Sequence, residues 1–194
     1  MPDPAPVDPE VAAALLRSHL EDFFENSPRV AHAPGWRHEQ TADPLIAIVH
    51  MPARALAGAD PDLYALRLDG SHYDTWPVSA TFVEADEGGW RRARLGSPAF
   101  PLLRGSPGAP PVEEAHQAIG FQFALHDDYS WPDQHTDQLI CFSYNLGFYT
   151  TNHTATAEQT WRPGWDRLDA TLSRIHAALN SPAYAGPSDL DVAA

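Results

Sequence analysis

The sequence predicts a single α+β domain, because apolar residues recur at helical spacing near both ends of the chain and at strand spacing between them. Helical spacing covers residues 9–25 and 165–180. Short apolar or alternating runs, bounded by proline and turn residues, favour strands at 45–51, 63–68, 78–84 and 119–125. This order predicts an N-terminal helix, a four-stranded antiparallel meander, an irregular segment and a C-terminal helix.

The first helix has a clear start and stop. Asp8 can cap it, Pro9 suits the first helical position, and Glu10 places an acid where the helix dipole favours one. Asn26-Ser27-Pro28 ends it. The residues expected to face the core are Val11, Leu15, Leu16, Leu20, Phe23 and Phe24.

The last helix is predicted from one apolar face and a proline-containing stop. Its apolar positions are spaced by four, three and four residues, at Leu168, Leu172, Ile175 and Leu179. Ser181-Pro182 follows and ends the helix. We therefore expect one domain over 9–187, with tails at 1–8 and 188–194.

Residues 86–118 interrupt the regular pattern, because glycines and five prolines break every period. A segment of this composition predicts a long loop with few backbone hydrogen bonds. It lies inside the domain, between the third and fourth expected strands.

Composition and the N-terminal sequence indicate where the protein is located in the cell and which classes of partner it does not bind. The net charge of −14 opposes binding to nucleic acid or to an anionic membrane. The single cysteine excludes an intramolecular disulfide, and the N-terminal residues lack the basic start and apolar run of a signal peptide. No apolar run approaches membrane-spanning length. These features predict a cytoplasmic protein.

Cys141 is the residue to which the chemistry can be assigned. It lies in Leu139-Ile140-Cys141-Phe142, and a cysteine between apolar residues is commonly a buried, inert core residue. Its surroundings favour a functional role. Trp131-Pro132-Asp133 precedes it, and Trp161-Arg162-Pro163 follows it just before the last helix.

This order resembles the ubiquitin-conjugating (UBC) family. Trp131-Pro132-Asp133 falls at the spacing of the family's His-Pro-Asn triplet, Ile140-Cys141 keeps the hydrophobic-Cys pair, and Trp161-Arg162-Pro163 keeps the Trp-x-Pro. The segment Tyr73-Asp74-Thr75-Trp76-Pro77 corresponds to the family's tyrosine- and proline-rich link. The resemblance covers about residues 9–187.

Several residues depart from the family pattern. Trp131 stands where the family has histidine, Asp133 where it has asparagine, and Gln138 where it has glycine. Extra residues within Asn145 to Thr160 separate the cysteine from Trp161. The pattern is similar to that of diverged bacterial relatives. For these the resemblance implies neighbouring activating-enzyme-like and deubiquitinase-like genes, often in antiphage operons.

The resemblance implies a thioester on Cys141. An activating enzyme would deliver a ubiquitin-like modifier to the thiol, and an amine would then take it, with no cofactor. Aminolysis passes through an oxyanion, to which a protonated Asp133 or Asn145 could donate a hydrogen bond. Asp133 could instead take a proton from the amine, or be a plain turn residue. Trp131 or Asp133 should lie beside the reacting carbonyl.

Two other interpretations remain open. The substitutions at Trp131 and Asp133 also suit a binding scaffold with the same fold and an inactive site. Alternatively, the Cys, His and carboxylate residues of this region suit zinc or a cysteine hydrolase with a histidine base. The residues concerned are His126, Asp127, Asp128, His135, Cys141 and His153.

Overall fold

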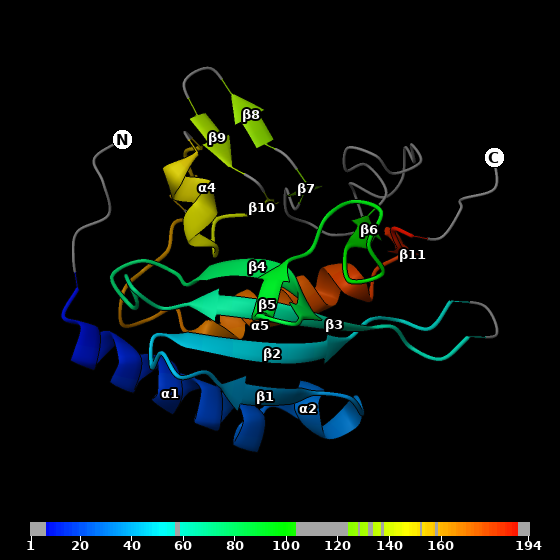
Figure 1. Cartoon of the computed structure of the whole chain (residues 1–194). Helices are drawn as coiled ribbons and strands as arrows, with labels where there is room; N and C mark the ends of the chain where they lie inside the picture. Colours follow the sequence, from blue (N-terminus) through cyan, green and yellow to red (C-terminus); the bar gives the residue numbers. More distant parts are fainter. Residues whose placement is uncertain are drawn as a thin grey trace.

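Five antiparallel strands, ordered along the sheet as they are along the chain, form the centre of the protein (Figure 1). The structure is a computed structural model that describes residues 7–56, 59–103, 124–127, 129–131, 134–136, 138–151, 153–157 and 159–189. The strands are β1 (Arg37–Gln40), β2 (Ile46–Pro52), β3 (Leu63–Asp69), β4 (Ser79–Asp86) and β5 (Gly89–Arg92). The mixed α+β class predicted from the sequence is confirmed.

The helices and three small two-stranded sheets complete the described fold. The helices are α1 (Pro9–Asn26), α2 (Pro28–His32), α4 (Leu146–Thr150) and α5 (Leu168–Leu179). The small sheets pair β6 (Pro101–Leu103) with β11 (Tyr184–Pro187), β7 (Ala124–His126) with β10 (Leu139–Cys141), and β8 (Tyr129–Trp131) with β9 (Gln134–Thr136). In the described part of the chain, no helix has the length and apolar character needed to cross a membrane.

The main core lies between one face of the sheet and the helices α1 and α5, and α5 is seen behind the sheet in Figure 1. Ala47 of β2 pairs with Leu68 of β3, and Leu68 pairs with Ala80 of β4, so these three side chains lie on the same face of the sheet. All three are buried, together with Leu16 of α1 and Leu172 of α5. A smaller cluster of Ile48, Ala65 and Val83 occupies the opposite face.

The capping of α1 is as predicted, but one of its core positions is not. The Asp8 carboxylate accepts hydrogen bonds from the backbone N–H groups of Glu10 (2.9 Å) and Val11 (3.2 Å). Val11 itself is 52% exposed, whereas Ala12 is fully buried. Ala12 heads the stripe that continues through Leu16 and Leu20, and Val11 is turned away from that stripe.

Helix α5 begins at Leu168, three residues later than position 165. The Asp166 carboxylate accepts from the backbone N–H of Arg162 (2.8 Å) and from its guanidinium (3.0 and 3.1 Å). These bonds fix residues 162–166 as a turn, so the helix starts only after it.

The prediction that residues 119–125 form the fourth strand of the meander is wrong. Of residues 119–125, the structure describes Ala124 and Leu125, which pair with Cys141 and Ile140 outside the five-stranded sheet. The sheet instead contains β1 and β5, which are short and mostly exposed strands at its two edges. Neither has the apolar alternation from which a strand can be recognised.

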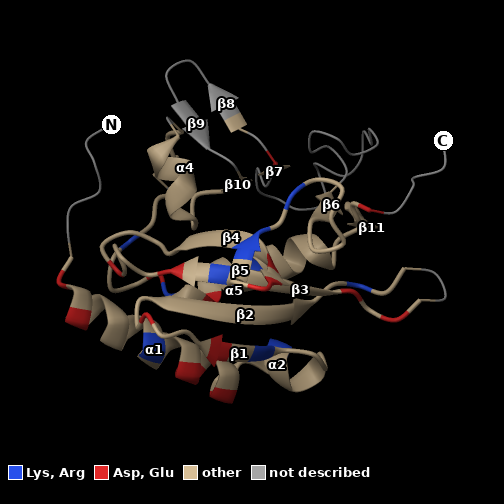
Figure 2. Cartoon of the chain, in the orientation of Figure 1, with Lys and Arg blue, Asp and Glu red and all other residues tan. Residues whose placement is uncertain are grey.

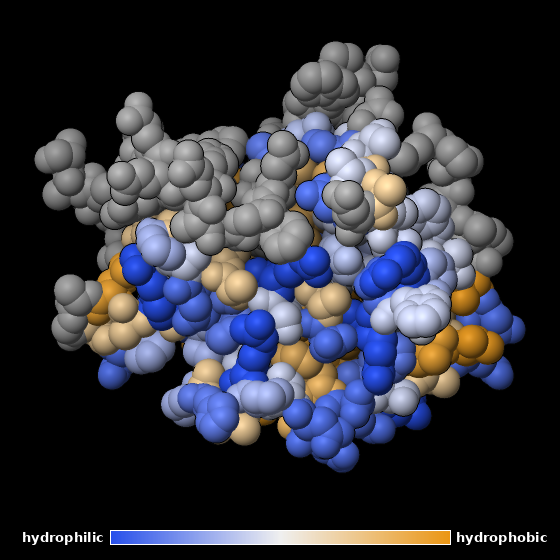
Figure 3. All heavy atoms as spheres, turned by 180° about the vertical axis from the view of Figure 1, so that it is seen from behind, coloured by the Kyte–Doolittle hydropathy of each residue, from blue (hydrophilic) through white to orange (hydrophobic). Residues whose placement is uncertain are grey.

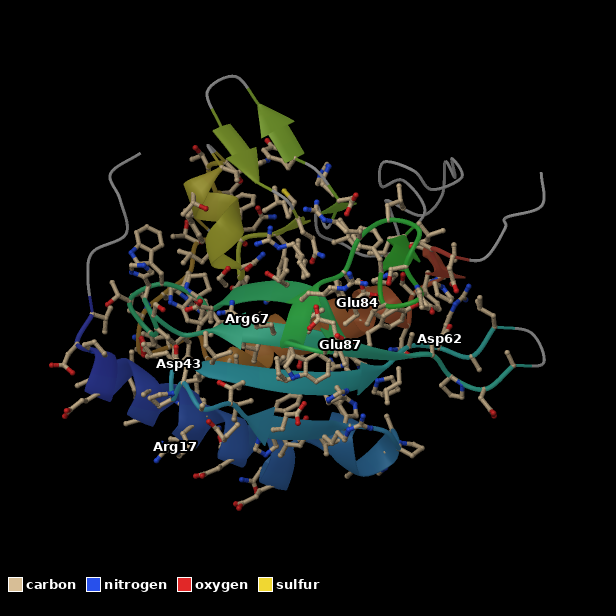
Figure 4. All side chains as sticks on the ribbon, in the orientation of Figure 1. Arg17, Asp43, Asp62, Arg67, Glu84 and Glu87 are labelled. Carbon is tan, nitrogen blue, oxygen red and sulfur yellow. The ribbon has the colours of Figure 1, made fainter. Side chains whose placement is uncertain are left out.

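Part of the expected loop at 86–118 forms strands. Strand β5 forms a hairpin with β4, and Arg91 forms an ion pair with Glu84 (2.9 Å), which is labelled in Figure 4. Strand β6 pairs with β11, and beyond it the Ser188 hydroxyl donates to the Ser97 carbonyl (2.8 Å). The hydrogen bonds that hold the C-terminal segment therefore reach as far as Ser188. The rest of the expected loop, from residue 104, lies outside the described residues.

Acidic and basic residues are unevenly distributed over the surface. Acidic residues follow the outer side of α1 in Figure 2, whereas the blue basic segments include β5. Seen from the opposite side, the described surface mixes hydrophilic and hydrophobic residues (Figure 3).

The Tyr73 hydroxyl joins three parts of the fold. It accepts a hydrogen bond from the backbone N–H of Leu168 (2.9 Å), at the start of α5, and it lies 2.5 Å from His19 Nδ1 on α1. The Tyr73 oxygen accepts the bond from Leu168, because a backbone N–H can only donate, and the contact with His19 Nδ1 is a second hydrogen bond of the same hydroxyl. Burial is the main cause that lowers the pKa of His19.

We expect Tyr73→Phe to lower the free energy of unfolding by about 1–3 kcal/mol, because the buried N–H of Leu168 loses its acceptor. Tyr144→Phe is the matched control, since the Tyr144 hydroxyl has no hydrogen bond among the described residues and should cost less than about 0.5 kcal/mol. Urea denaturation measures both. Equal losses in the two variants would contradict the bridging role of Tyr73.

His176 on α5 is a partly buried histidine that should contribute to the loss of stability in acid. Its ring lies 5.0 Å from the Trp36 ring, and its Nδ1 atom is buried with no hydrogen-bond partner among the described residues. Burial, with a smaller contribution from the positive charge of Arg29, lowers its pKa to about 4. The unfolded chain therefore binds this proton at a higher pH than the folded chain does.

Stability should accordingly fall as the pH decreases from the usual histidine pKa of about 6.5 to the folded value of about 4. We expect His176→Phe, which still packs on Trp36 but cannot titrate, to remove about 1–3 kcal/mol of that loss. Replacing the exposed His32 with phenylalanine should leave the loss unchanged. Urea denaturation of the three proteins at pH 7 and at pH 4.5 provides the comparison, and a loss of the same size in His176→Phe would contradict this assignment.

Candidate active site

Strand β10 holds Cys141 above the central sheet. All three of its residues are buried, and it pairs with β7 rather than with a strand of the main sheet. Helix α4 follows it after a short turn, and side chains occupy the space between α4 and the sheet in Figure 4. The position of Cys141 therefore depends on what fastens β10 to that sheet.

Two amide side chains fasten β10 to strand β4. The Gln138 side chain accepts from the Phe82 N–H (2.7 Å) and donates to the carbonyl groups of Phe82 (3.3 Å) and Ala93 (3.0 Å). The Asn145 side chain accepts from the Ala80 N–H (2.8 Å) and donates to the Ile140 carbonyl (2.6 Å). We call Gln138 and Asn145 the amide bracket, since one stands before β10 and the other after it.

The bracket occupies an edge that β4 leaves unpaired. Strand β5 pairs with β4 only over Val83 to Asp86, so the outward N–H groups of Ala80 and Phe82 have no strand partner among the residues that the structure describes. Both residues are buried, where unpaired N–H groups would be costly. The bracket amides satisfy these groups and thereby fix the strand that contains Cys141.

The Cys141 side chain is close to fully buried. The residue is 9% exposed and belongs to the main hydrophobic cluster. Burial raises the pKa of its thiol to about 11, because the thiolate is poorly solvated there. A thiol in this setting needs help to lose its proton at neutral pH.

His153 lies beside that thiol. Its Nε2 atom is 3.5 Å from Cys141 Sγ, and its Nδ1 atom is 3.1 Å from the Thr151 hydroxyl oxygen. The ring is held on its flat side by Phe148, with ring centroids 4.9 Å apart, and it also contacts Tyr129 at 5.6 Å. The imidazole is thus fixed at both nitrogens and packed between aromatic rings.

The other histidines of this region do not complete a metal site within the described residues. His126 contacts the Tyr129 ring at 5.2 Å, and burial, followed by the charge of His153, lowers its pKa. Among the residues that the structure describes, no three histidine, cysteine or carboxylate side chains are grouped to hold a metal ion. The side chain of His135 and all of Asp128 lie outside the described part.

Some of the predicted site residues lie together in the structure, one has a different role, and others have side chains outside the described part. Cys141 and His153 come together, whereas the amide of Asn145, which was expected to stabilise an oxyanion, is bonded to the main chain and only 2% exposed. The backbone of Trp131 ends strand β8, but its side chain is not described. Asp133 lies outside the described residues, so its proximity to Cys141 stays a prediction.

The link between β3 and β4 packs against the segment that precedes α5. Trp161 Nε1 donates to the Asp74 carbonyl (2.9 Å), and the rings of Tyr73 and Trp161 lie 6.1 Å apart. On its other side, the Trp161 backbone N–H donates to the Tyr149 hydroxyl (2.9 Å) of α4. Tyr149, in the segment after Cys141, therefore hydrogen-bonds Trp161, and Trp161 in turn hydrogen-bonds Asp74 of the link.

Comparison of this chain with protein-family models, with curated proteins and with solved structures gives no match. The case for a function therefore depends on the geometry of the site and on the resemblance in its motifs.

Sequence reasoning missed the roles of Gln138 and Thr151. Gln138 was noticed only as a departure from the UBC pattern, and its position seven residues before Asn145 gives no local signal of a shared partner. Thr151 and His153 lie in a polar stretch without periodicity. Only the turn after α4 brings them back to Cys141.

We expect Asn145→Ala to destabilise the fold by about 2–5 kcal/mol, because both Ala80 N–H and Ile140 C=O lose a buried partner. Asn26→Ala is a suitable control, since the exposed Asn26 amide bonds only the Asp22 carboxylate (2.8 Å). Its cost should stay within about 0.5 kcal/mol. If thermal and urea unfolding show Asn145→Ala to be as stable as the control, the bracket does not fasten β10.

Proposed function

We propose that this chain is a UBC-like protein that carries a ubiquitin-like modifier as a thioester on Cys141 and passes it to an amine. An activating enzyme would supply the modifier, as the resemblance implies. The observation that carries the proposal is the packing of the region around Cys141 against the two other motifs on which the resemblance depends. Trp161 contacts both the Asp74 link and Tyr149, which follows the cysteine by eight residues.

The order of the elements supports the same proposal. An N-terminal helix precedes an antiparallel meander, the Tyr73–Pro77 link lies between β3 and β4, and Trp161-Arg162-Pro163 leads into α5. The expected meander was only partly right, because β1 and β5, rather than residues 119–125, join β2, β3 and β4 in the sheet. The order of helix, antiparallel sheet, cysteine and helix along the chain supports the proposal.

A thiol with a raised pKa suits a carrier. The rate at which a thioester loses its sulfur rises as the pKa of the leaving thiol falls. The Cys141 thiol, with a pKa raised to about 11 by burial, is a poor leaving group and would hold its acyl group against stray hydrolysis. The chain also has no lysine, so a loaded Cys141 would meet no lysine amine of its own chain.

The burial of Cys141 also favours a second candidate, a UBC-like binding scaffold without catalysis. The thiol of a residue that is only 9% exposed and belongs to the main core cluster would be inert if no motion presented it to a partner. The two candidates differ in one property, which is whether the native thiol reacts.

The test is a transfer reaction read on a non-reducing gel. The protein is incubated with the activating enzyme and modifier encoded beside it, and Cys141→Ser is run in parallel. We expect a thiol-sensitive adduct with the wild type and a thiol-resistant oxyester with Cys141→Ser, because an alkoxide leaves less readily than a thiolate.

A small thiol reagent separates the two candidates without any partner protein. For the carrier, native protein at neutral pH should be alkylated at its single thiol. No alkylation until the chain is unfolded in urea, together with no adduct in the transfer reaction, would exclude the carrier and favour the scaffold.

A further inference from the structure

We propose that His153 is the general base for Cys141, held in the required tautomer by the Thr151 hydroxyl. The proposal rests on the carrier function above and adds to it a catalytic residue that the UBC resemblance does not supply. Its basis is the position of the His153 ring, whose two nitrogens face Cys141 Sγ at 3.5 Å and Thr151 Oγ1 at 3.1 Å.

The hydrogen bonds of Thr151 determine which nitrogen of His153 carries the proton. The Thr151 hydroxyl oxygen lies 2.6 Å from the Gly147 carbonyl oxygen, and a carbonyl can only accept. The hydroxyl proton is therefore committed to Gly147, and the hydroxyl can only accept from His153 Nδ1. The proton of the neutral ring then lies on Nδ1, and the lone pair of Nε2 points at the thiol.

The ring is also prevented from turning away. Phe148 stacks on it at 4.9 Å with planes inclined by 33°, and Tyr129 lies at 5.6 Å. Thr151 is only 6% exposed, so its hydroxyl has little access to competing water. A base held in this way is oriented before the substrate arrives.

Such a base meets a need of this particular thiol. At pH 7 a thiol whose pKa is about 11 is ionised in only about one molecule in ten thousand. Nε2 removes the Sγ proton as the sulfur lone pair forms a bond to the acyl carbon of the incoming thioester. The tetrahedral intermediate expels the donor sulfur, which takes the proton back from His153. The products are the Cys141 thioester and the free donor thiol.

Two titratable groups on neighbouring strands bear on this proton. His126 on β7 interacts electrostatically with His153, so a proton on one ring disfavours a proton on the other. Tyr129 on β8 contacts both histidine rings, and burial followed by the charge of Cys141 raises its pKa, so it stays neutral. A single proton is therefore exchanged between Cys141 and His153.

The experiment measures the rate of Cys141 alkylation by iodoacetamide from pH 5 to pH 10 in the full-length wild type and in His153→Gln. We expect the variant to react about 100-fold more slowly near pH 7. The difference between the two proteins should be largest near neutral pH, where the thiol without a base is almost fully protonated. The two rates should approach each other as the pH nears the thiol pKa of about 11, because hydroxide then forms the thiolate.

Two further variants distinguish catalysis from a change in folding. His153→Ala leaves space for an imidazole ring, so added imidazole should restore part of its rate at neutral pH. Thr151→Val should lower the rate at neutral pH, whereas Thr151→Ser keeps the hydroxyl and should behave like the wild type. A structural role alone would give neither rescue by imidazole nor a changed pH profile.

The possible outcomes are separable. Equal rates in wild type and His153→Gln at every pH would overturn the role of His153 and leave the carrier function standing. A thiol that reacts in neither native protein would overturn the role of His153, and, together with no adduct in the transfer reaction, it would overturn the carrier function as well. A slow His153→Gln variant whose rate rises with pH, with rescue of His153→Ala by imidazole, would establish the base.

Discussion

The amide bracket is the constraint on which the site depends. Strand β4 is only half covered by β5, and the remaining outward N–H groups, from Ala80 and Phe82, are buried. A third paired strand would satisfy them, but the chain uses the side chains of Asn145 and Gln138 instead. Because each buried N–H would cost about 1–3 kcal/mol without a partner, the fold cannot easily release this contact. The strand that carries Cys141 is fixed as a consequence.

That arrangement gives Cys141 two properties that oppose each other. Fastening β10 to the sheet buries the thiol and raises its pKa, which would stabilise the proposed thioester but hinder its formation. The turn after α4 returns the chain to the sulfur with His153, whose orientation depends on Thr151. The same local fold thus supplies both the burial and the group that can compensate for it.

The helices and strands that could be predicted from the sequence are those specified by residues close to one another in the chain. Asp8 and the apolar stripe define α1, and apolar runs of β-branched and aromatic residues define β2, β3 and β4. The edge strands β1 and β5 are polar and short, and only pairing with a neighbour makes them strands. At the site, Cys141 was predictable because it is unique, whereas its contact with His153 depends on a turn whose path no short motif specifies.

The most direct test of this account is amide hydrogen exchange of Ala80 and Phe82, followed residue by residue by NMR. Within the described part of the chain no strand pairs with either N–H group, and the bracket amides are their hydrogen-bond partners. The account predicts exchange as slow as that of the β3 amides, which are paired on both sides within the sheet. Exchange of Ala80 and Phe82 at the rate of exposed loop amides would contradict it, because Cys141 would then have no fixed position above the sheet.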